Sequence, residues 1–305
     1  MAGYTRLTLK HALGLAAPHT WPASIFPVLL GTALSVALAG FFSWLIFVLV
    51  AIAAILLQSS VNTINDYYDF LKGNDSKANS DDPQDAVLVY NNIDPKTVRR
   101  LGFSFMAAAV VLGIYPVYRG GLVTLVLGMT GCLVIIAYSV GKKPISYRPW
   151  GELVSGTVMG GLLTLAVFSS FTGYAKPKLF FLAIPLIFGI GLIMMTNNIC
   201  DIEKDAPIGR KTLPLLLGRF RAKAVYLCCL GLWLLSTVVI TAMHFSGGLW
   251  PLCLLLLIIA PLWLRLARLS YTPEQRKQCM GVILLANLCV NTTYVAVIIL
   301  HTLRS

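Results

Sequence analysis

Long apolar runs, separated by short polar stretches, organise this chain. We expect nine membrane-spanning segments, at residues 21–40, 42–64, 102–118, 121–140, 153–171, 179–199, 224–243, 249–264 and 280–301. Most are long enough for a helix to cross about 30 Å of hydrocarbon, and a helix satisfies its own backbone hydrogen bonds in lipid. The runs are too continuous for barrel strands, which alternate over about ten residues. The pattern therefore predicts an all-α polytopic membrane protein in which residues 1–305 form a single transmembrane domain.

Composition agrees with a membrane protein. Of the 305 residues, 57% are apolar and only 12% are charged, whereas soluble domains carry roughly 25% charged residues. A soluble protein with this much apolar surface would aggregate, so the lipid bilayer is the expected environment.

The distribution of charge predicts the orientation. With the N-terminus in the cytosol, 20 of the 24 Lys and Arg and all twelve Asp and Glu fall in cytosolic stretches; the exceptions are Arg119, Lys176, Lys178 and Arg304. Cytosolic loops of membrane proteins carry an excess of Lys and Arg. We therefore expect a multi-pass protein of the cell membrane with its active site on the cytoplasmic side. The net charge of +12 follows from this topology and does not indicate a nucleic-acid partner.

The first candidate site lies where the second predicted span meets the cytosol. Helical neighbours are three and four residues apart, so Asn62, Asp66 and Asp69 share one helix face, with Asn65 beside them. Asp75 follows the helix end and could fold back. Clustered carboxylates repel one another unless a cation lies between them, and oxygen ligands favour hard ions such as Mg²⁺. Mg²⁺ is commonly held by one or two carboxylates together with substrate phosphates.

A second cluster with related spacing ends the sixth predicted span. Asn197 and Asp201 repeat the four-residue spacing of Asn62 and Asp66, and Asp205 follows one turn later. Ionisable residues at the membrane boundary in two matched clusters are usually functional. Together the clusters favour a site for Mg²⁺ and a diphosphate.

Basic and aromatic residues accompany the acids. Arg210 and Lys211 follow the second cluster, and Lys143 lies in the loop after the fourth span; such cations suit the remaining charge of a diphosphate. Tyr138 ends the fourth span, where its ring either stabilises a carbocation by a cation–π contact or belongs to the aromatic belt of the membrane interface.

The two acidic motifs resemble those of the UbiA superfamily of membrane prenyltransferases. The first reads Asn62-x-x-Asn65-Asp66-Tyr67-Tyr68-Asp69-x-x-x-Gly73-x-Asp75, and the second reads Asn197-Asn198-x-x-Asp201-x-x-x-Asp205-x-x-x-Gly209-x-Lys211-Thr212-Leu213. The form of the first motif is most similar to the 1,4-dihydroxy-2-naphthoate prenyltransferases of menaquinone synthesis. Two features depart from the family pattern: an acidic stretch at residues 81–85, and Ala17 where a basic residue is expected before Pro18.

The resemblance implies a fold, a cofactor and a reaction. Nine transmembrane helices would surround a central cavity in which Mg²⁺ ions hold a polyprenyl diphosphate. Departure of diphosphate would leave an allylic cation for attack by an aromatic quinone precursor, here 1,4-dihydroxy-2-naphthoate, to give demethylmenaquinone. The implied metal-side residues are Asn62, Asn65, Asp66, Asp69, Asp75, Asn197, Asp201 and Asp205; the implied catalytic residues are Asp66, Asp69, Asp201, Asp205 and Tyr138; the implied diphosphate-binding residues are Lys143, Arg210 and Lys211.

Two alternatives remain at the level of sequence. The same chemistry could serve another acceptor: 4-hydroxybenzoate, haem or a glycerol-phosphate lipid. An ion-coupled transporter would also use repeats and intramembrane acids, although transporters usually bind near the midplane and these acids lie at one face.

Overall fold

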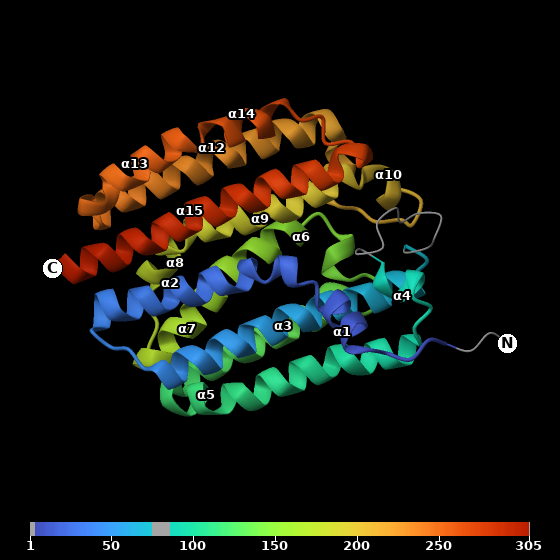
Figure 1. Cartoon of the computed structure of the whole chain (residues 1–305), viewed down its shortest axis with the longest axis horizontal. Helices are drawn as coiled ribbons and strands as arrows, with labels where there is room; N and C mark the ends of the chain where they lie inside the picture. Colours follow the sequence, from blue (N-terminus) through green and yellow to red (C-terminus); the bar gives the residue numbers. More distant parts are fainter. Residues whose placement is uncertain (1–3, 75–85, 305) are drawn as a thin grey trace.

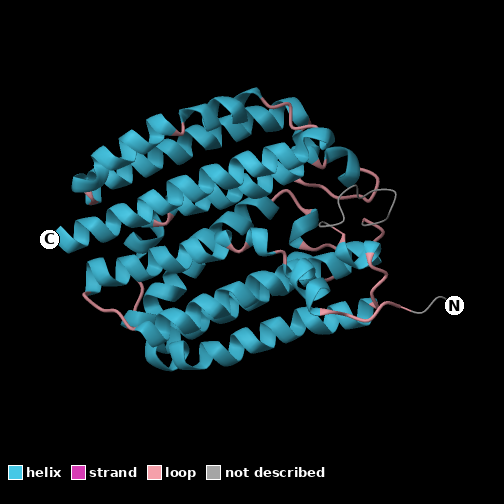
Figure 2. Cartoon of the chain, viewed as in Figure 1, coloured by secondary structure: helices cyan, strands magenta, loops and turns pink. Residues whose placement is uncertain are grey.

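A computed structural model describes residues 4–74 and 86–304. The chain forms a bundle of helices that run side by side, with only helices and loops in this part of the chain (Figures 1 and 2). The all-α prediction is confirmed. The candidate ligand Asp75 and the acidic stretch 81–85 lie outside the described residues.

The helices follow one another closely along the chain. They are α1 (Leu9–Ala16), α2 (Pro22–Ala39), α3 (Trp44–Leu71), α4 (Val87–Tyr90), α5 (Pro95–Ser139), α6 (Gly151–Ser155), a π-helical turn (Gly156–Leu162) leading into α7 (Leu163–Thr172), α8 (Pro177–Leu182), α9 (Ile184–Cys200), α10 (Ile202–Asp205), α11 (Leu213–Leu217), α12 (Arg219–His244), α13 (Leu249–Ile258), α14 (Ala260–Arg268) and α15 (Arg276–Arg304).

Six helical segments in the described residues are long and apolar enough to cross a membrane, or seven if α13 and α14, bent by 47°, make one span. The expected count is higher because α5 holds two predicted segments, 102–118 and 121–140. As one straight helix its 45 residues would extend about 68 Å, roughly twice the hydrocarbon thickness. The element leaves helical geometry at Gly121, where φ is 65° and ψ is −156°. The α9 helix is also apolar, but at 17 residues it is shorter than the others.

Small residues let the centre of the bundle pack closely. Gly156 and Gly160, in the π-helical turn, face the backbone of α9 at Ile187; a Cβ on Gly160 would lie only 2.6 Å from the Ile187 nitrogen. The small-residue pattern at 156–161 is thus a helix-packing surface, as expected for membrane helices that approach through glycine.

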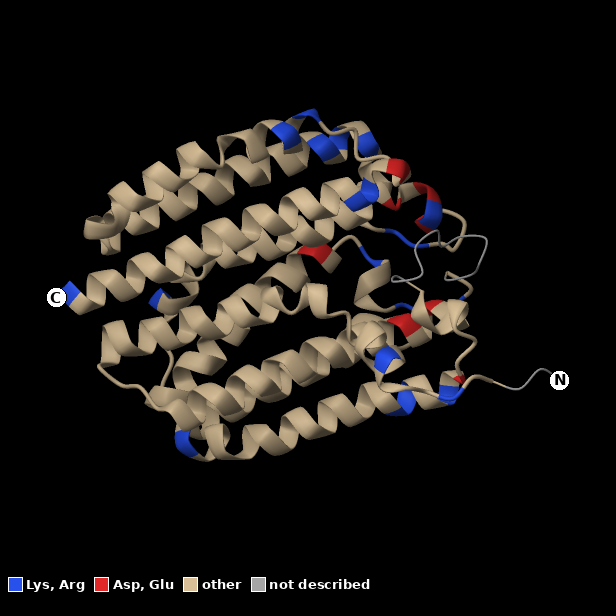
Figure 3. Ribbon diagram, in the orientation of Figure 1, with Lys and Arg blue, Asp and Glu red and all other residues tan. Residues whose placement is uncertain are grey.

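Charge gathers at one end of the bundle. In Figure 3 the acidic ribbon, and most of the basic ribbon, lies toward the end that carries α1, α4 and α10, which we call the charged end. The opposite end carries a few basic positions. This segregation agrees with the one-sided distribution of charge predicted from the sequence.

Candidate functional site

A cavity of about 650 Å³ lies among the helices, within the range of roughly 300–1,000 Å³ typical of small-molecule sites. Its wall along α3 runs from Asp69 to Ala54, positions 15 residues apart in the sequence and therefore about 22 Å apart along the helix. The wall is polar toward the charged end. Away from that end it is mostly apolar, with Leu57, Val61 and Ile190 among its residues.

The first acidic motif is built on the last turns of α3. Asp69 is 6% exposed and accepts a hydrogen bond from Asn65 Nδ2 at 2.8 Å. Asn65 Oδ1 in turn accepts from Ser139 Oγ at 3.1 Å, which ties α3 to the end of α5. Asp66 lines the cavity. Asn62 lines the cavity too, and its Nδ2 donates to Ala16 O at 3.0 Å, which ties α3 to the end of α1.

The second acidic motif joins the end of α9 to α10 and is held by a basic residue of α15. Asp201 pairs with Arg276, whose Nε lies 2.9 Å from Oδ1, and Arg276 Nη2 donates to Asn197 Oδ1 at 2.7 Å. Asp201, Asn197 and Arg276 all line the cavity. In the sequence, Arg276 is one of the cytosolic basic residues and was not predicted to belong to the site. The position of Arg276 just before the last predicted span is the only feature of the sequence that pointed to a place at the cavity.

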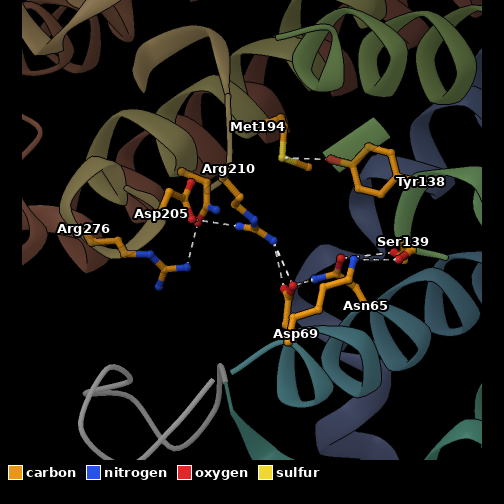
Figure 4. Close-up of polar contacts among 10 residues, drawn as sticks. Asn65, Asp69, Tyr138, Ser139, Met194, Asp205, Arg210 and Arg276 are labelled. Carbon is orange, nitrogen blue, oxygen red and sulfur yellow. Dashed lines mark hydrogen bonds and ion pairs between the residues drawn. The ribbon is translucent and has the colours of Figure 1, made fainter. Parts of the chain in front are cut away.

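Arg210 connects the two motifs (Figure 4). Its Nη2 donates to both oxygens of Asp69 at 3.0 Å, and its Nη1 donates to Asp205 at 3.0 Å. Burial lowers the pKa of Arg210, but the carboxylates of Asp69 and Asp205 outweigh it and leave that pKa raised. One guanidinium thus binds acids that are far apart in the sequence, a use for which its planar fork of donors is suited.

Asp205, one of the two carboxylates that Arg210 binds, is fully buried. Burial raises its pKa to about 6, and the nearby Arg210 opposes that shift. Its Oδ2 has no hydrogen-bond partner within the described residues. A buried carboxylate oxygen without a donor is costly, and it fits a position close to a cation.

Tyr147 supports Arg210 from the loop between α5 and α6. The Arg210 guanidinium carbon lies 4.8 Å from the centre of the Tyr147 ring, and Lys72 Nζ lies 4.3 Å from it. Lys211 N donates to Tyr147 O at 3.0 Å, which holds this loop against the one that carries Arg210. Tyr147 was not among the predicted site residues.

The other predicted residues fall into two groups. Tyr138 lines the cavity and donates its hydroxyl to Met194 Sδ at 3.4 Å. Lys143 and Lys211 are exposed and are not among the residues that line the cavity. Lys204 and Lys277 line it instead, and both had been counted only as topological charges.

The donor set suits Mg²⁺ shared with a phosphate. Within residues 4–74 and 86–304, no group of three or more His, Cys, Asp or Glu is placed to hold a metal ion alone. Asp66 on α3 and Asp201 between α9 and α10 both line the cavity, and Mg²⁺ often takes only one or two carboxylates when phosphate supplies further ligands. The residues present therefore fit Mg²⁺ that binds with its substrate.

The sequence matches known proteins over most of its length. A model of the UbiA prenyltransferase family matches residues 24–288. The 1,4-dihydroxy-2-naphthoate octaprenyltransferase of Bacillus subtilis is 34% identical over 204 residues, which cover 67% of this chain and 65% of that protein. The Haemophilus influenzae protein of the same name is 29% identical over 255 residues, 79% of this chain and 81% of that protein. UbiA prenyltransferase domain-containing protein 1 of Xenopus tropicalis is 29% identical over 68% of this chain and 60% of that protein. The match thus spans just under two thirds of the Bacillus and Xenopus relatives.

Solved structures share the fold. A UbiA homolog from Archaeoglobus fulgidus bound to GPP and Mg²⁺ superposes with a TM-score of 0.64 at 14% identity, covering 96% of this chain and 99% of that chain. A structure of digeranylgeranylglyceryl phosphate synthase gives a TM-score of 0.62 at 16% identity, over 95% and 98%. At such identities the likeness concerns the fold alone. The chain is an all-helical, multi-pass membrane protein of the UbiA fold, and it belongs to the UbiA prenyltransferase family.

Proposed function

We propose that this protein transfers an isoprenyl chain from a polyprenyl diphosphate to an aromatic acceptor, with 1,4-dihydroxy-2-naphthoate as the acceptor and the hydroquinone form of demethylmenaquinone as the product. One observation carries the proposal: a single cavity presents acidic and basic groups at the charged end and a mostly apolar wall along the rest of its length. That polarity matches a molecule with a charged head and a long apolar tail.

The polar end suits a diphosphate held by several groups at once. Arg210, Arg276, Lys204 and Lys277 line it and would take phosphate oxygens, since charge-assisted hydrogen bonds of this kind are strong. Mg²⁺, held through Asp66 and Asp201 with support from the other motif residues, would neutralise charge on the leaving diphosphate. Asp69 and Asp205 fix the guanidinium that faces the substrate.

The apolar part of the cavity suits the prenyl chain. Burial of each methylene contributes about 0.8 kcal/mol, so a chain of several isoprene units gains most of its affinity here. Walls from α3, α5, α7 and α9 contribute to this part, and they exclude water from the reacting carbon. That exclusion favours capture of the carbon by the aromatic acceptor over capture by water.

The reaction then needs few groups beyond those that bind. The bond between C1 of the chain and the diphosphate oxygen breaks, its electron pair leaves with diphosphate, and an allylic cation remains. The Tyr138 ring lies at the cavity wall and would stabilise this cation through its π face. A ring carbon of the acceptor forms the new bond to C1, and the acceptor carboxylate departs as CO₂.

We place the site on the cytoplasmic side of the cell membrane and count nine crossings. The nine-crossing count is supported by the two segments within α5, by the bent α13–α14 pair and by the short α9. The cytoplasmic assignment is supported by the basic and acidic residues at the charged end, because cytosolic loops carry the excess of Lys and Arg.

The Bacillus and Haemophilus relatives favour dihydroxynaphthoate as acceptor, while 4-hydroxybenzoate, haem and a glycerol-phosphate lipid are the competing acceptors. Family membership and the position of the acids at one end disfavour an ion-coupled transporter.

The test presents purified protein in liposomes with an all-trans polyprenyl diphosphate, Mg²⁺ and each acceptor in turn. We expect prenylated product with dihydroxynaphthoate. Product with a different acceptor alone would overturn the assignment, and no product with any acceptor would overturn the enzyme itself.

A further inference from the structure

A buried pair of polar side chains lies beside the cavity and outside the diphosphate-binding groups. Asn198 Nδ2 donates to Glu152 Oε1 at 2.9 Å. Glu152, at the start of α6, is 7% exposed, and Asn198, on α9, is 6% exposed. Glu152 Oε2 has no hydrogen-bond partner within the described residues. A buried carboxyl group in a membrane protein is costly and usually functional, and the reaction proposed above does not yet use this one.

The pair is separated from the cations by its depth along α9. Asn198 lines the cavity three residues before Asp201, which places it about 4.5 Å farther from the charged end. Met194, which accepts the Tyr138 hydroxyl, lies about one turn deeper still. Asn198, Met194 and Tyr138 all line the cavity. If the diphosphate lies at the charged end and the prenyl tail lies deeper in the cavity, C1 of the prenyl chain lies at the depth of these three residues.

The hydrogen bond decides which chemistry Asn198 offers. An ionised carboxylate only accepts hydrogen bonds, so the amide nitrogen of Asn198 must face Glu152. The amide then keeps its second N–H and its Oδ1 atom, and Oδ1 is the acceptor that Asn198 can present to a hydroxyl group. An acceptor at this position binds a hydroxyl group and repels phosphate oxygens, as does the carboxylate behind it.

We propose that Asn198 and Glu152 form the binding site for a hydroxyl group of the aromatic acceptor, with Asn198 contacting the hydroxyl and Glu152 holding and polarising Asn198. This inference rests on the proposed prenyl transfer and specifies the class of acceptor: a hydroxylated aromatic ring. Asn198 is the substrate-binding residue of the pair, and Glu152 is a positioning residue. The site places the ring at the level of the Tyr138 side chain, beside the carbon it attacks.

The test separates the two substrates of the reaction. In liposomes, Asn198→Ala and Glu152→Ala should raise KM for dihydroxynaphthoate about tenfold, the effect of about one hydrogen bond, while KM for the prenyl diphosphate changes by less than about twofold. Glu152→Gln keeps an acceptor oxygen for Asn198 and should restore most of the affinity. A merely structural role would not give this rescue together with a change confined to one substrate.

A matched control comes from the other side of α9. Asn287 is 4% exposed and donates to Gly189 O at 3.1 Å, but it is not among the cavity-lining residues. Asn287→Ala removes a buried amide of the same kind and should leave both KM values unchanged.

A second readout needs no turnover. We expect 1-hydroxy-2-naphthoate to compete with the acceptor more strongly than 2-naphthoate does in the parent protein, and this advantage should vanish in Asn198→Ala. Unchanged acceptor KM in Asn198→Ala, or an advantage of the hydroxyl that survives the substitution, would overturn the inference while leaving prenyl transfer intact. Absence of transfer by the parent protein would instead mean that the proposed function is wrong.

Discussion

Replacing Arg210 by alanine should destabilise the fold, because it leaves two buried carboxylates without their shared cation. The guanidinium makes contacts of 3.0 Å to Asp69 and Asp205, and the side chains are only 10%, 9% and 0% exposed, in that order. Removal of one partner from a buried ion pair costs about 3–5 kcal/mol, most of it from the charge left behind. We expect a loss of this size, measured as a lower midpoint of thermal unfolding in one fixed detergent.

The same substitution has a second expected consequence. If the loss comes from the abandoned charges, then adding Asp69→Asn and Asp205→Asn to Arg210→Ala should recover much of it, although the triple variant will be inactive. Glu203→Gln is the control, since it breaks a pair whose side chains are 27% and 55% exposed and should cost about 1 kcal/mol at most. An Arg210→Ala protein as stable as the parent, or a triple variant no more stable than the single one, would refute this account of the bridge.

Three further predictions concern other parts of the chain. Arg276→Gln should raise KM for the prenyl diphosphate about tenfold, because it removes one charge-assisted contact at the polar end of the cavity. Gly160→Leu should destabilise the bundle by about 1–3 kcal/mol in thermal unfolding, since even a Cβ there would lie 2.6 Å from the Ile187 nitrogen. Arg219 lowers the pKa of Glu203 below its ordinary value of 4.5, so the pair stabilises the fold above that value and the effect disappears as pH falls through the lowered pKa. The stabilities of the parent and Glu203→Gln, measured as a function of pH, should therefore converge in acid.

Each of these has an outcome that contradicts it. Arg265→Ala removes a positive charge from α14 at the same end of the bundle, and if it raises the prenyl-diphosphate KM as much as Arg276→Gln does, general electrostatic attraction explains both. A Gly160→Leu protein with parental stability would mean that α9 can move away from the π-helical turn. A difference between the parent and Glu203→Gln that widens in acid would reverse the sign assigned to the pair.

The sequence was sufficient for the class of fold and for the parts of the site that lie within one helix. Apolar length predicts crossings, and three- and four-residue spacing places Asp66 and Asp69 near one another on α3. The apparent number of spans differs because the chain changes direction at Gly121 without a polar loop, so two predicted crossings lie within the single element α5.

Contacts between helices were beyond the sequence. No spacing rule relates Arg210 to Asp69, or Arg276 to Asp201, because packing of distant helices brings them together. The exposure of individual side chains could not be predicted either. Lys143 and Lys211 follow or flank the acidic motifs in the sequence and were predicted to bind phosphate, but both are exposed and neither lines the cavity. Asn198 and Glu152 gave no signal as a pair, since 46 residues separate them.

The central claim is that both acidic motifs act together on one prenyl diphosphate in one cavity. The most direct measurement is prenyl transfer to dihydroxynaphthoate in liposomes, with Mg²⁺ or EDTA, by the parent protein and by Asp66→Asn, Asp201→Asn and Asp94→Asn. Asp94 caps α5 through a hydrogen bond to Lys96 N at 3.0 Å and is not a cavity-lining residue, so its variant is the control. The account predicts transfer that requires Mg²⁺, that is lost in either motif variant alone and that persists in Asp94→Asn. Transfer that continues in EDTA would contradict it, and so would transfer that continues in Asp66→Asn or in Asp201→Asn.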